Sequence, residues 1–446
     1  MRSLEQIGQE LAGYDPQSLR AGMVGEFLQR LVSPVTEIET IGIFDALGRV
    51  LATDLISPIS VPPHNNSAMD GYAFAGAQLV PGQPLVLQVA GTALAGKAWA
   101  GPVQPGQCLR IMTGAILPEG LDTVVAQELV SVNSDQITLA ADVVRPGDNR
   151  RLLGEDLMQG QPALCKGELL APAALGLVAS LGITEVPVLR RLKVAYFSTG
   201  DEILSLGEAP REGAVYDSNR YTVFGLLTQL GCEVIDLGVV RDDPLALEAA
   251  FVHAAQQADA IITSGGVSVG EADYTKAMMK KLGDVTFWKI AMRPGRPMAV
   301  GQISRTKLAS RHYLASADSS HKDNNLQAGH AVLFGLPGNP VAVMVTFLAF
   351  VRPALLRLMG ARAVGTPLLK ARSAETIRKK PGRTEYQRGI FSAAPDGLPT
   401  VRTTGNQGSG VLSSMVQANG LIVLQHDQGN VAVGDLVDVM LFDGVM

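Results

Sequence analysis

The residues with the clearest chemical potential lie in a glycine-rich segment near the middle of the chain. Residues 264–270 read SGGVSVG and follow the apolar run Ala260–Ile262. Glycine lets backbone N–H groups approach an anion closely, and serine hydroxyls add further donors. A strand, this loop and a following helix would form a cradle for a phosphate or an oxyanion. An ordinary strand-to-helix turn is the alternative, because the segment matches neither the Walker loop nor the GxGxxG pattern.

Basic residues follow this loop on a stiff stretch of chain. Lys289, Arg293 and Arg296 stand around two prolines in the sequence KIAMRPGRP. Proline restricts the backbone around it, and fixed cations suit a ligand that carries several negative charges. The other interpretation is a solvated basic loop. The glycine loop and these cations together predict a site for a multiply charged anion.

Acidic residues stand where three predicted strands end. From Lys193 onward, apolar runs typical of buried strands alternate with helical patterns, which predicts a doubly wound α/β domain with a mostly parallel sheet. Ligands of such sheets bind at the carboxyl ends of the strands, where Glu202, Asp242 and Asp273 should converge. Carboxylates beside an anion site repel the ligand unless a divalent cation such as Mg²⁺ lies between them. We therefore predict that these three residues hold Mg²⁺; isolated surface acids are the alternative.

Other parts of the chain carry short strand patterns. Residues 76–145 contain β-rich runs separated by Pro-Gly turns, which predicts a small barrel or sandwich inserted in the chain. Residues 366–446 return to short strands and predict a small β-domain. The segment 304–330 is polar and rich in turn residues, and we expect an extension without a chemical role.

Loops outside the α/β domain combine turn residues with polar side chains. Segment 61–74 is dense in turn residues and runs into a short strand, and segment 145–156 places arginines close to carboxylates. In the C-terminal part, Arg388 precedes a glycine, and Ser409 ends the stretch GNQGS. Arginine with backbone amides suits an anion. Ordinary turns and solvated charge runs explain the same sequences, so both interpretations stay open.

Composition excludes several classes of function. The chain has 446 residues and a formal net charge of −5, so it has no overall positive field for nucleic acid or an anionic membrane. Cys108, Cys165 and Cys232 lie far apart without a CxxC pattern, which argues for a reducing compartment and against a zinc cluster or disulfide framework. The N-terminus lacks the apolar core of a signal peptide, and the apolar run Val341–Val351 is too short to span a bilayer. We expect a soluble, cytoplasmic protein.

Motifs from all parts of the chain coincide in one family. They include NNSAMDGYA, MTGA, RRLLGED, FSTGDE, YDSNR, IITSGGVSVGEADYTK, RPGRP, LPGNPVA and QGS. Together they resemble molybdopterin molybdenumtransferases of the MoeA type, and they are similar also to the C-terminal domain of gephyrin. The resemblance covers nearly the whole chain. It implies a transferase of molybdenum cofactor biosynthesis that inserts molybdenum from molybdate into adenylylated molybdopterin, releases AMP and needs a divalent cation such as Mg²⁺.

The resemblance also implies an assembly and a domain plan. We expect a homodimer whose active cleft lies between the α/β domain of one subunit and the N-terminal domains of the other, and a contact with the molybdopterin adenylyltransferase. The implied fold class is multidomain α/β plus β: a doubly wound α/β molybdopterin-binding domain, an N-terminal elongated linking domain with an inserted β-barrel-like domain, and a C-terminal small β-domain. The expected limits are 1–56 and 146–189 for the linking domain, 57–145 for the inserted domain, 190–365 for the α/β domain and 366–446 for the C-terminal domain.

Site residues follow from the resemblance, position by position. The implied catalytic residues are Asp70, Thr113, Asp156, Glu202, Asp242, Asp273 and Lys289, with Glu202, Asp242 and Asp273 as metal ligands. The implied substrate-binding residues are Ser264, Gly265, Gly266, Ser268, Arg293, Arg296, Pro337, Pro340, Arg388 and Ser409. Arg293 and Arg296 stand where relatives often have lysine, which keeps the charge but replaces a point ammonium with a planar fork. Gly410 stands where some relatives have histidine.

Two other functions remain to be weighed. The first is the related adenylyltransferase step, because that enzyme resembles the α/β domain. The N-terminal motifs and the C-terminal β-domain argue against it, and ATP consumption with metal-free molybdopterin would favour it. The second is a gephyrin-like scaffold that clusters partners. The cleft of acidic and basic residues and the lack of a long disordered linker argue against a purely structural role, and tight partner binding without metal transfer would favour it.

Overall fold

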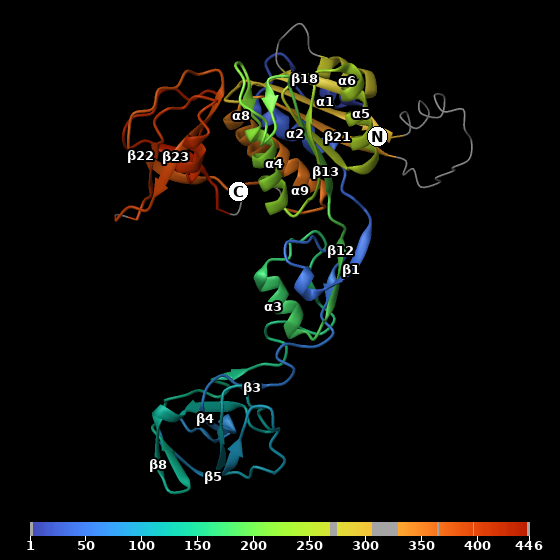
Figure 1. The fold of residues 1–446 in the computed structure, drawn as a ribbon. Coiled ribbons are helices and arrows are strands. Elements are labelled where there is room, and N and C mark those ends of the chain that lie inside the picture. The colour runs from blue at the N-terminus through green and yellow to red at the C-terminus, as the bar shows by residue number, and fades with distance from the viewer. Residues whose placement is uncertain (1–2, 268–273, 306–328, 364, 396, 444–446) are drawn as a thin grey trace, which may run out of the picture.

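The computed structural model describes residues 3–267, 274–305, 329–363, 365–395 and 397–443. Figure 1 shows three regions along the molecule: an α/β region with the C-terminal strands beside it, a narrow linking region, and a β-rich region at the far end. The substrate-binding prediction Ser268, the metal-ligand prediction Asp273 and most of the extension 304–330 lie outside the described residues.

A six-stranded sheet forms the centre of the α/β region, in the spatial order β16–β13–β17–β21–β20–β18. Its strands are β13 (Lys193–Thr199), β16 (Glu233–Val240), β17 (Ala260–Ser264), β18 (Gly283–Lys289), β20 (Pro297–Ser304) and β21 (His330–Leu336). Strands β16, β13, β17 and β21 pair in parallel, whereas β20 pairs antiparallel with both β21 and β18. Strand β18 therefore runs in the same direction as the parallel strands, and all five end at one edge of the sheet.

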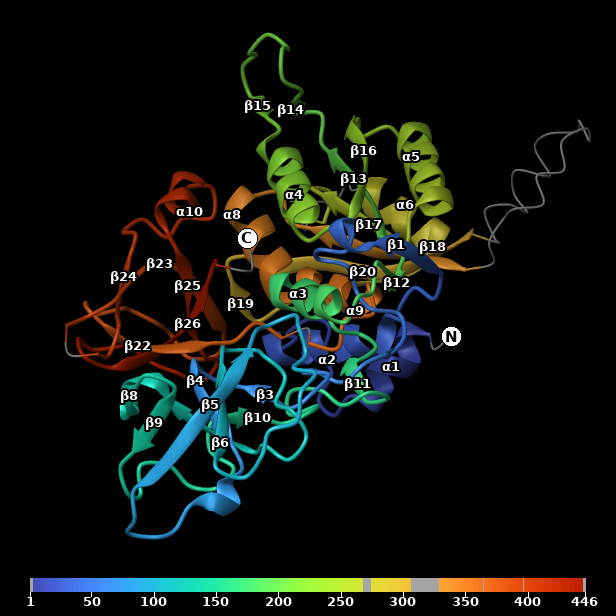
Figure 2. The same cartoon turned by 90° about the horizontal axis from the view of Figure 1, so that it is seen from below.

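Helices cover both faces of this sheet because its strands are apolar on both sides. The helices are α4 (Ser218–Gln229), α5 (Pro244–Gln257), α6 (Tyr274–Leu282), α8 (Pro340–Thr346) and α9 (Arg352–Leu358). Successive side chains of β13 alternate: Val194 and Tyr196 join a core with α4, α8 and α9, whereas Ala195 and Phe197 join a second core with α5 and α6. Figure 2 shows α4 and α8 on one side of the strands and α5 and α6 on the other. The predicted doubly wound α/β unit is confirmed.

The N-terminal helices α1 (Leu4–Glu10) and α2 (Ala21–Leu31) also pack into the core that contains α8 and α9. Phe27 lies edge-on to Trp288, at 5.0 Å between ring centroids, and the Trp288 Nε1–H donates to the Tyr14 hydroxyl at 2.9 Å. The first helices, expected in the linking domain, thus share their hydrophobic core with the sheet.

Helices α8 and α9 are joined by a π-helical turn, η4 (Phe347–Val351). Pro353 follows this turn; proline removes one N–H donor and its ring crowds the preceding carbonyls, and a widened turn relieves that conflict. The continuous helix Pro340–Leu358 is long and apolar enough to cross a membrane, but 78% of its apolar window is buried. Its packing is that of a core helix.

The linking region is built on a two-stranded antiparallel ribbon, in which β1 (Ile38–Gly42) pairs with β12 (Glu185–Leu189). A small separate core lies at its lower end and includes Leu51, Leu170 and Val178. The other elements of this region are η1 (Ile43–Asp45), β2 (Leu55–Ile56), β11 (Pro162–Leu164) and α3 (Pro172–Ser180).

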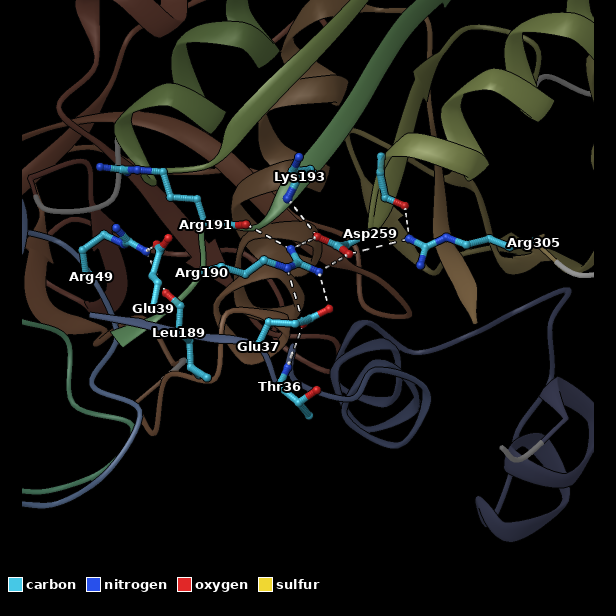
Figure 3. A network of polar contacts seen from close by, with 11 residues as sticks. Thr36, Glu37, Glu39, Arg49, Leu189, Arg190, Arg191, Lys193, Asp259 and Arg305 are labelled. Carbon is cyan, nitrogen blue, oxygen red and sulfur yellow. Dashed lines mark hydrogen bonds and ion pairs between the residues drawn. The ribbon is translucent and has the colours of Figure 1, made fainter. Parts of the chain in front are cut away.

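Charged residues fasten this ribbon to the sheet at the point where the ribbon meets β13 (Figure 3). Asp259 accepts hydrogen bonds from both terminal nitrogens of Arg190, at 2.7 and 2.9 Å, and from the Lys193 backbone N–H at 2.9 Å. Arg190 also pairs with Glu37 at 3.3 Å, so one guanidinium joins both ribbon strands to the sheet. Arg305 lies 3.6 Å from the same carboxylate.

The inserted region is a mixed sheet in the order β7–β4–β6–β5–β9–β8. Its strands are β4 (Gly71–Phe74), β5 (Leu85–Ala93), β6 (Gln107–Ile111), β7 (Thr123–Ala126), β8 (Val130–Asn133) and β9 (Gln136–Leu139), with the short turns η2 (Gly76–Gln78) and η3 (Gln127–Leu129). The short strands β3 (Asn66–Ser67) and β10 (Arg150–Arg151) pair where the chain enters and leaves it.

The C-terminal strands close a five-stranded barrel, because β23 pairs with both β24 and β25. Its elements are β22 (Leu369–Ser373), β23 (Thr384–Ser392), β24 (Thr400–Thr403), α10 (Ser413–Gln417), β25 (Gly420–Leu424) and β26 (Leu436–Leu441). The short strand β19 (Met292–Arg293) pairs in parallel with β23. The basic loop of the α/β region is therefore joined by backbone hydrogen bonds to the C-terminal barrel.

Candidate active site

A cavity of about 420 Å³ lies at the carboxyl edge of the sheet, where the C-terminal barrel adjoins it. Several predicted site residues line it together, from four strand ends, the basic loop and the C-terminal barrel: Glu202, Asp242, Gly265, Gly266, Arg293, Arg296, Pro337 and Ser409. Acidic and basic side chains that are up to about 200 residues apart in the chain thus meet in one cavity, as the parallel topology predicts.

Glu202 and Asp242 form the acidic side of this cavity, after strands β13 and β16 respectively. Gly200 allows this arrangement: its φ is +139°, and a Cβ atom there would lie 2.6 Å from the Glu202 Oε2 atom. A side chain at position 200 would therefore push the Glu202 carboxylate away. The Asp242 backbone N–H donates to the Asp201 Oδ1 atom at 3.3 Å, which holds the two acidic loops together.

Close contacts with neighbouring atoms explain why glycine occupies the two positions after β17. A Cβ atom on Gly265 would lie 2.4 Å from the Thr199 carbonyl oxygen, and one on Gly266 would lie 2.5 Å from the Thr275 Cβ. Both residues have positive φ, +89° and +60°, so the loop needs glycine for conformation as well as space. Ser264 plays another part: it is 2% exposed, and its hydroxyl bonds to those of Tyr196 and Ser198 beneath the cavity.

The basic side of the cavity comes from the turn between β18 and β20. Arg293 and Arg296 line it, and Gly295 between them has a φ of +90° with the Thr346 Oγ1 atom 2.4 Å from its ideal Cβ position. The turn is thereby packed against α8. Lys289 ends β18 at the same edge, but it is exposed and is not one of the described residues that line the cavity.

The C-terminal barrel contributes Ser409 to the cavity and Arg388 to a neighbouring hollow of about 250 Å³. The two hollows share Arg293, Pro294 and Gln407, so they are adjacent. The Arg388 side chain is 1% exposed, and its hydrogen-bond partners are the hydroxyl of Ser414 and backbone carbonyls. Burial, together with the nearby charge of Arg293, lowers the pKa of Arg388 to about 10. Two cations held this close favour an anion between them.

Three predicted catalytic residues lie elsewhere. Asp70 and Thr113 meet in the inserted region, where the Asp70 Oδ1 atom accepts from both the backbone N–H and the hydroxyl of Thr113, each at 2.7 Å. These bonds lower the pKa of Asp70. Asp156 is exposed, and its backbone N–H donates to the Val61 carbonyl. Figure 1 shows strand β4, which follows Asp70, at the far end of the molecule from the sheet. The three do not line the cavity within one described chain.

The acidic side of the cavity can bind a divalent cation only if substrate phosphates or water supply further ligand atoms. Among the described residues no group of three His, Cys, Asp or Glu side chains could hold a metal ion. Glu202 and Asp242 supply two carboxylates, and Asp273 lies outside the described residues. Mg²⁺ is commonly bound by one or two carboxylates together with substrate phosphates and water, so two carboxylates beside an anion site are compatible with it.

Comparison with known proteins identifies the family. Three family models match in succession: the MoeA N-terminal region (domain I and II) over residues 23–182, the probable molybdopterin binding domain over 195–357, and the MoeA C-terminal region (domain IV) over 370–442. The molybdopterin molybdenumtransferase of Haemophilus influenzae is 41% identical over 422 residues, which cover 94% of this chain and 98% of that protein. The chain belongs to the molybdopterin molybdenumtransferase family. The predicted resemblance is confirmed.

Further members of the molybdopterin molybdenumtransferase family agree. Molybdopterin molybdenumtransferase 2 of Mycobacterium tuberculosis is 33% identical and covers 90% of this chain and 94% of its own. Gephyrin of Dictyostelium discoideum is 30% identical, and the match covers 91% of this chain but 59% of gephyrin. The crystal structure of a molybdopterin biosynthesis moeA protein from Pyrococcus horikoshii OT3 aligns with a TM-score of 0.75 at 26% identity, covering 95% of this chain and all of that one.

The cavity also contains residues that the sequence motifs did not single out. Thr199, Asn339 and Gln407 line it. The Thr199 hydroxyl is buried, and it has no hydrogen-bond partner among the described residues. All three stand inside motifs of the molybdopterin molybdenumtransferase family, FSTGDE, LPGNPVA and QGS. Their position next to a predicted site residue could have identified them as cavity residues.

Proposed function

We propose that the protein inserts molybdenum from molybdate into adenylylated molybdopterin and releases AMP, with the help of a divalent cation. The observation that supports this proposal is the single cavity in which Glu202 and Asp242 face Arg293 and Arg296 beside a glycine loop. Molybdate is a dianion and the organic substrate carries a pyrophosphate. Both anions need cations and N–H donors, and the pyrophosphate also needs a metal ion if carboxylates lie next to it.

Different basic residues bind the two anions in this proposal. Arg293 and Arg296 lie next to the glycine loop, where the pyrophosphate can accept from the N–H group of Gly266. The Gly265 N–H donates to the Leu336 carbonyl at 3.3 Å and ties the start of the loop to β21. Arg388 and Ser409 lie on the barrel side, where molybdate would bind next to the dithiolene end of the substrate. The planar forks of Arg293 and Arg296 can each give two parallel donors to an oxyanion. Arg388 would act mainly through its charge, because its Nε and Nη2 already donate to Ser414 and to backbone carbonyls of the barrel.

The acidic residues act on the bond that breaks. Glu202, Asp242 and Asp273 would hold Mg²⁺, which neutralises the pyrophosphate and makes AMP a better leaving group. Gly200 leaves space for the Glu202 carboxylate, and the bond from the Asp242 backbone N–H to Asp201 holds the backbone of the Asp242 loop. A molybdate oxygen would attack the phosphorus of the molybdopterin phosphate, and the bond from that phosphorus to the AMP oxygen would break. The two dithiolene sulfurs would then replace two molybdate oxygens, of which one stays on the phosphate and the other leaves as water with the two thiol protons.

The remaining predictions concern assembly and location. We propose a homodimer in which Asp70, Thr113 and Asp156 of one subunit complete the cleft of the other, because these polar residues lie outside the cavity of their own chain. The linking region offers an unusually exposed apolar side chain, Phe44, which is 97% exposed and suited to a contact between subunits. We also propose a contact with the molybdopterin adenylyltransferase, a cytoplasmic location, and the four domains with the limits given above.

The proposal is tested by measuring AMP release from adenylylated molybdopterin and molybdate. We expect Asp242→Asn to lower the rate by roughly 100-fold or more, because one neutral amide replaces an anionic ligand of the metal site. Asp236→Asn is the matched control, since Asp236 pairs with Arg220 on the outer surface, and it should release AMP at nearly the wild-type rate. An Asp242→Asn enzyme with undiminished turnover would remove the acidic side of the cavity from the mechanism.

A further inference from the structure

The loop Leu336–Pro340 lies between the parallel sheet and the C-terminal barrel. An asparagine of α4 bonds to this loop, and an asparagine of the loop bonds to the barrel. Gly338 and Asn339 of this loop line the cavity. Asn219 belongs to the first turn of α4, and Asn339 belongs to the loop itself.

Asn219 fixes the loop to the α/β region. Its side chain is 8% exposed, and its Nδ2–H donates to the Gly338 carbonyl at 2.7 Å. The orientation of the amide follows from this contact, because the opposite orientation would set two carbonyl oxygens against each other. The Asp217 carboxylate caps α4 by accepting from the Arg220 backbone N–H at 3.0 Å, so the helix end that carries Asn219 is itself held in place.

Asn339 fixes the same loop to the C-terminal barrel. Its Nδ2–H donates to the Ser409 hydroxyl oxygen at 3.0 Å. Two residues later, the Val341 backbone N–H donates to the Ser409 carbonyl at 3.1 Å. Ser409 is therefore bound through both its side chain and its backbone to a loop of the other domain.

The barrel segment that contains Ser409 is in turn built around Arg388. The Arg388 Nη2–H donates to the carbonyls of Gly408, at 2.9 Å, and Asn406, at 3.2 Å. The Arg388 backbone N–H donates to the Gln407 Oε1 atom at 2.8 Å. Hydrogen bonds and the peptide links between neighbouring residues thus connect α4, the loop Leu336–Pro340, Ser409 and the buried Arg388.

We infer that Asn219 and Asn339 are positioning residues that hold Ser409 and Arg388 of the C-terminal barrel against the cavity for binding of the metal oxyanion. This inference rests on the proposed function for the identity of the anion. The Nδ2–H groups of both asparagines donate to protein partners, so they act through Gly338 and Ser409. The Asn219 Oδ1 atom is buried and has no partner among the described residues. Without the two asparagines the β19–β23 pairing and the bond from the Val341 N–H still hold the barrel beside the basic loop, but the segment around Ser409 loses its side-chain anchor to the loop Leu336–Pro340.

The test combines hydrogen exchange with molybdate binding. In Asn339→Ala, we expect the backbone amides of residues 405–412 to exchange roughly 3- to 10-fold faster, the effect of losing one net hydrogen bond. The dissociation constant for molybdate, measured by calorimetry, should rise by a similar factor. Asn219→Ala should show the same pair of changes. Amides of β25 report whether the barrel remains folded in each variant, and they should exchange at the wild-type rate.

Two further variants separate positioning from general stability. Asn419→Ala removes two hydrogen bonds within the barrel, one to the Phe391 carbonyl and one from the Phe391 backbone N–H, and should leave both measurements unchanged. Asn339→Asp loses the donating amide, but its carboxylate can accept from the Ser409 hydroxyl instead. We therefore expect exchange in 405–412 to return towards the wild-type rate, while the added negative charge keeps molybdate binding weak.

Unchanged exchange in Asn339→Ala, or faster exchange with an unchanged dissociation constant, would overturn the inference. Turnover is measured separately, as the Michaelis constant for molybdate and the maximal rate of AMP release. The inference requires the Michaelis constant to rise in Asn339→Ala with a much smaller change in maximal rate. A wild-type protein that binds molybdate but releases no AMP would defeat the proposed function, whereas the exchange and binding results would still decide the inference.

Discussion

Backbone conformations available only to glycine shape the candidate active site at the scale of single residues. Gly200, Gly265 and Gly295 all have positive φ, and each approaches a neighbouring atom too closely for a Cβ. Each stands beside a residue that lines the cavity and brings backbone N–H groups or a charged neighbour towards the ligand. Charged side chains give the cavity its charge. The glycines, which have no side chain, leave the space that sets its shape.

We expect Gly265→Ala to destabilise the protein by about 1–3 kcal/mol, because the added Cβ meets the Thr199 carbonyl and alanine resists a positive φ. Gly225→Ala is the matched control: it lies on the open side of α4 and should stabilise by roughly 0.5–1 kcal/mol. Urea denaturation of both variants checks the two signs. Equal stabilities for Gly265→Ala and the wild type would show that the loop can relax around a side chain.

Elements far apart in the chain meet at the junction between ribbon and sheet, and Asp259 is the centre of that junction. Burial alone would raise the pKa of this carboxyl, but hydrogen bonds from Arg190 and from the Lys193 backbone lower it below its ordinary value of 3.8. The ionised form is therefore the one that the folded protein stabilises. Its contribution is fully present above about pH 4 and is lost as the pH falls below that value, through the lowered pKa.

We expect Asp259→Asn to lower the free energy of unfolding at pH 7 by about 3 kcal/mol, because the change leaves Arg190 partly buried without its carboxylate. The difference from wild type should shrink as the pH falls below 4, where Asp259 itself becomes neutral. In a Trp99→Phe background, fluorescence of the buried Trp288 reports unfolding of the sheet. The exposed pair formed by Asp236 is the control, and Asp236→Asn should cost less than about 1 kcal/mol. A pH-independent difference would contradict the assignment to Asp259 ionisation.

In the whole molecule, the linking region separates two groups of the site residues that the family implies. Glu202 and Asp242 lie at the sheet, whereas Asp70 and Thr113 lie in the inserted region at the other end of Figure 1. A cleft shared between two subunits reconciles this separation with a single reaction. The proposal has a direct consequence for mixtures of inactive variants.

Asp70→Asn and Asp242→Asn should each be inactive alone, yet their mixture should regain activity after subunit exchange. Random pairing makes half of the dimers mixed, and each mixed dimer has one intact cleft, so we expect roughly a quarter of the wild-type rate of AMP release. Mixing Asp242→Asn with Glu202→Gln is the control and should regain nothing, because both changes lie in the same cavity. No recovery in the first mixture would place the site within one chain.

Local sequence patterns predicted much of the fold and of the candidate site. The alternation of apolar runs and helical segments predicted the α/β unit, and the residues after its strands predicted the acidic and glycine-rich parts of the cavity. Glu202 and Asp242 could be placed together from sequence because parallel strands end at one edge, whatever the details of packing. Arg293 and Arg296 were found by charge and by the prolines around them.

Packing between distant segments decided the rest. Nothing local in α1 and α2 says that their apolar faces join the core of the sheet, since an amphipathic helix can pack on any apolar surface. Ser264 looked like a ligand donor, but its hydroxyl is used by Tyr196 beneath the cavity. Lys289 ends β18 at the same edge as the acidic residues but outside the cavity lining of the described chain.

By itself, the sequence determined the family, the sheet and the chemical character of the cavity, because residue type and strand direction are encoded locally. The tertiary structure alone decided how the C-terminal barrel meets the sheet. The contacts of β19 with β23, and of Asn339 with Ser409, join segments that are about 70 to 90 residues apart. Hydrogen bonds of this kind depend on the final distance between two folded units, and no local pattern of residues records that distance.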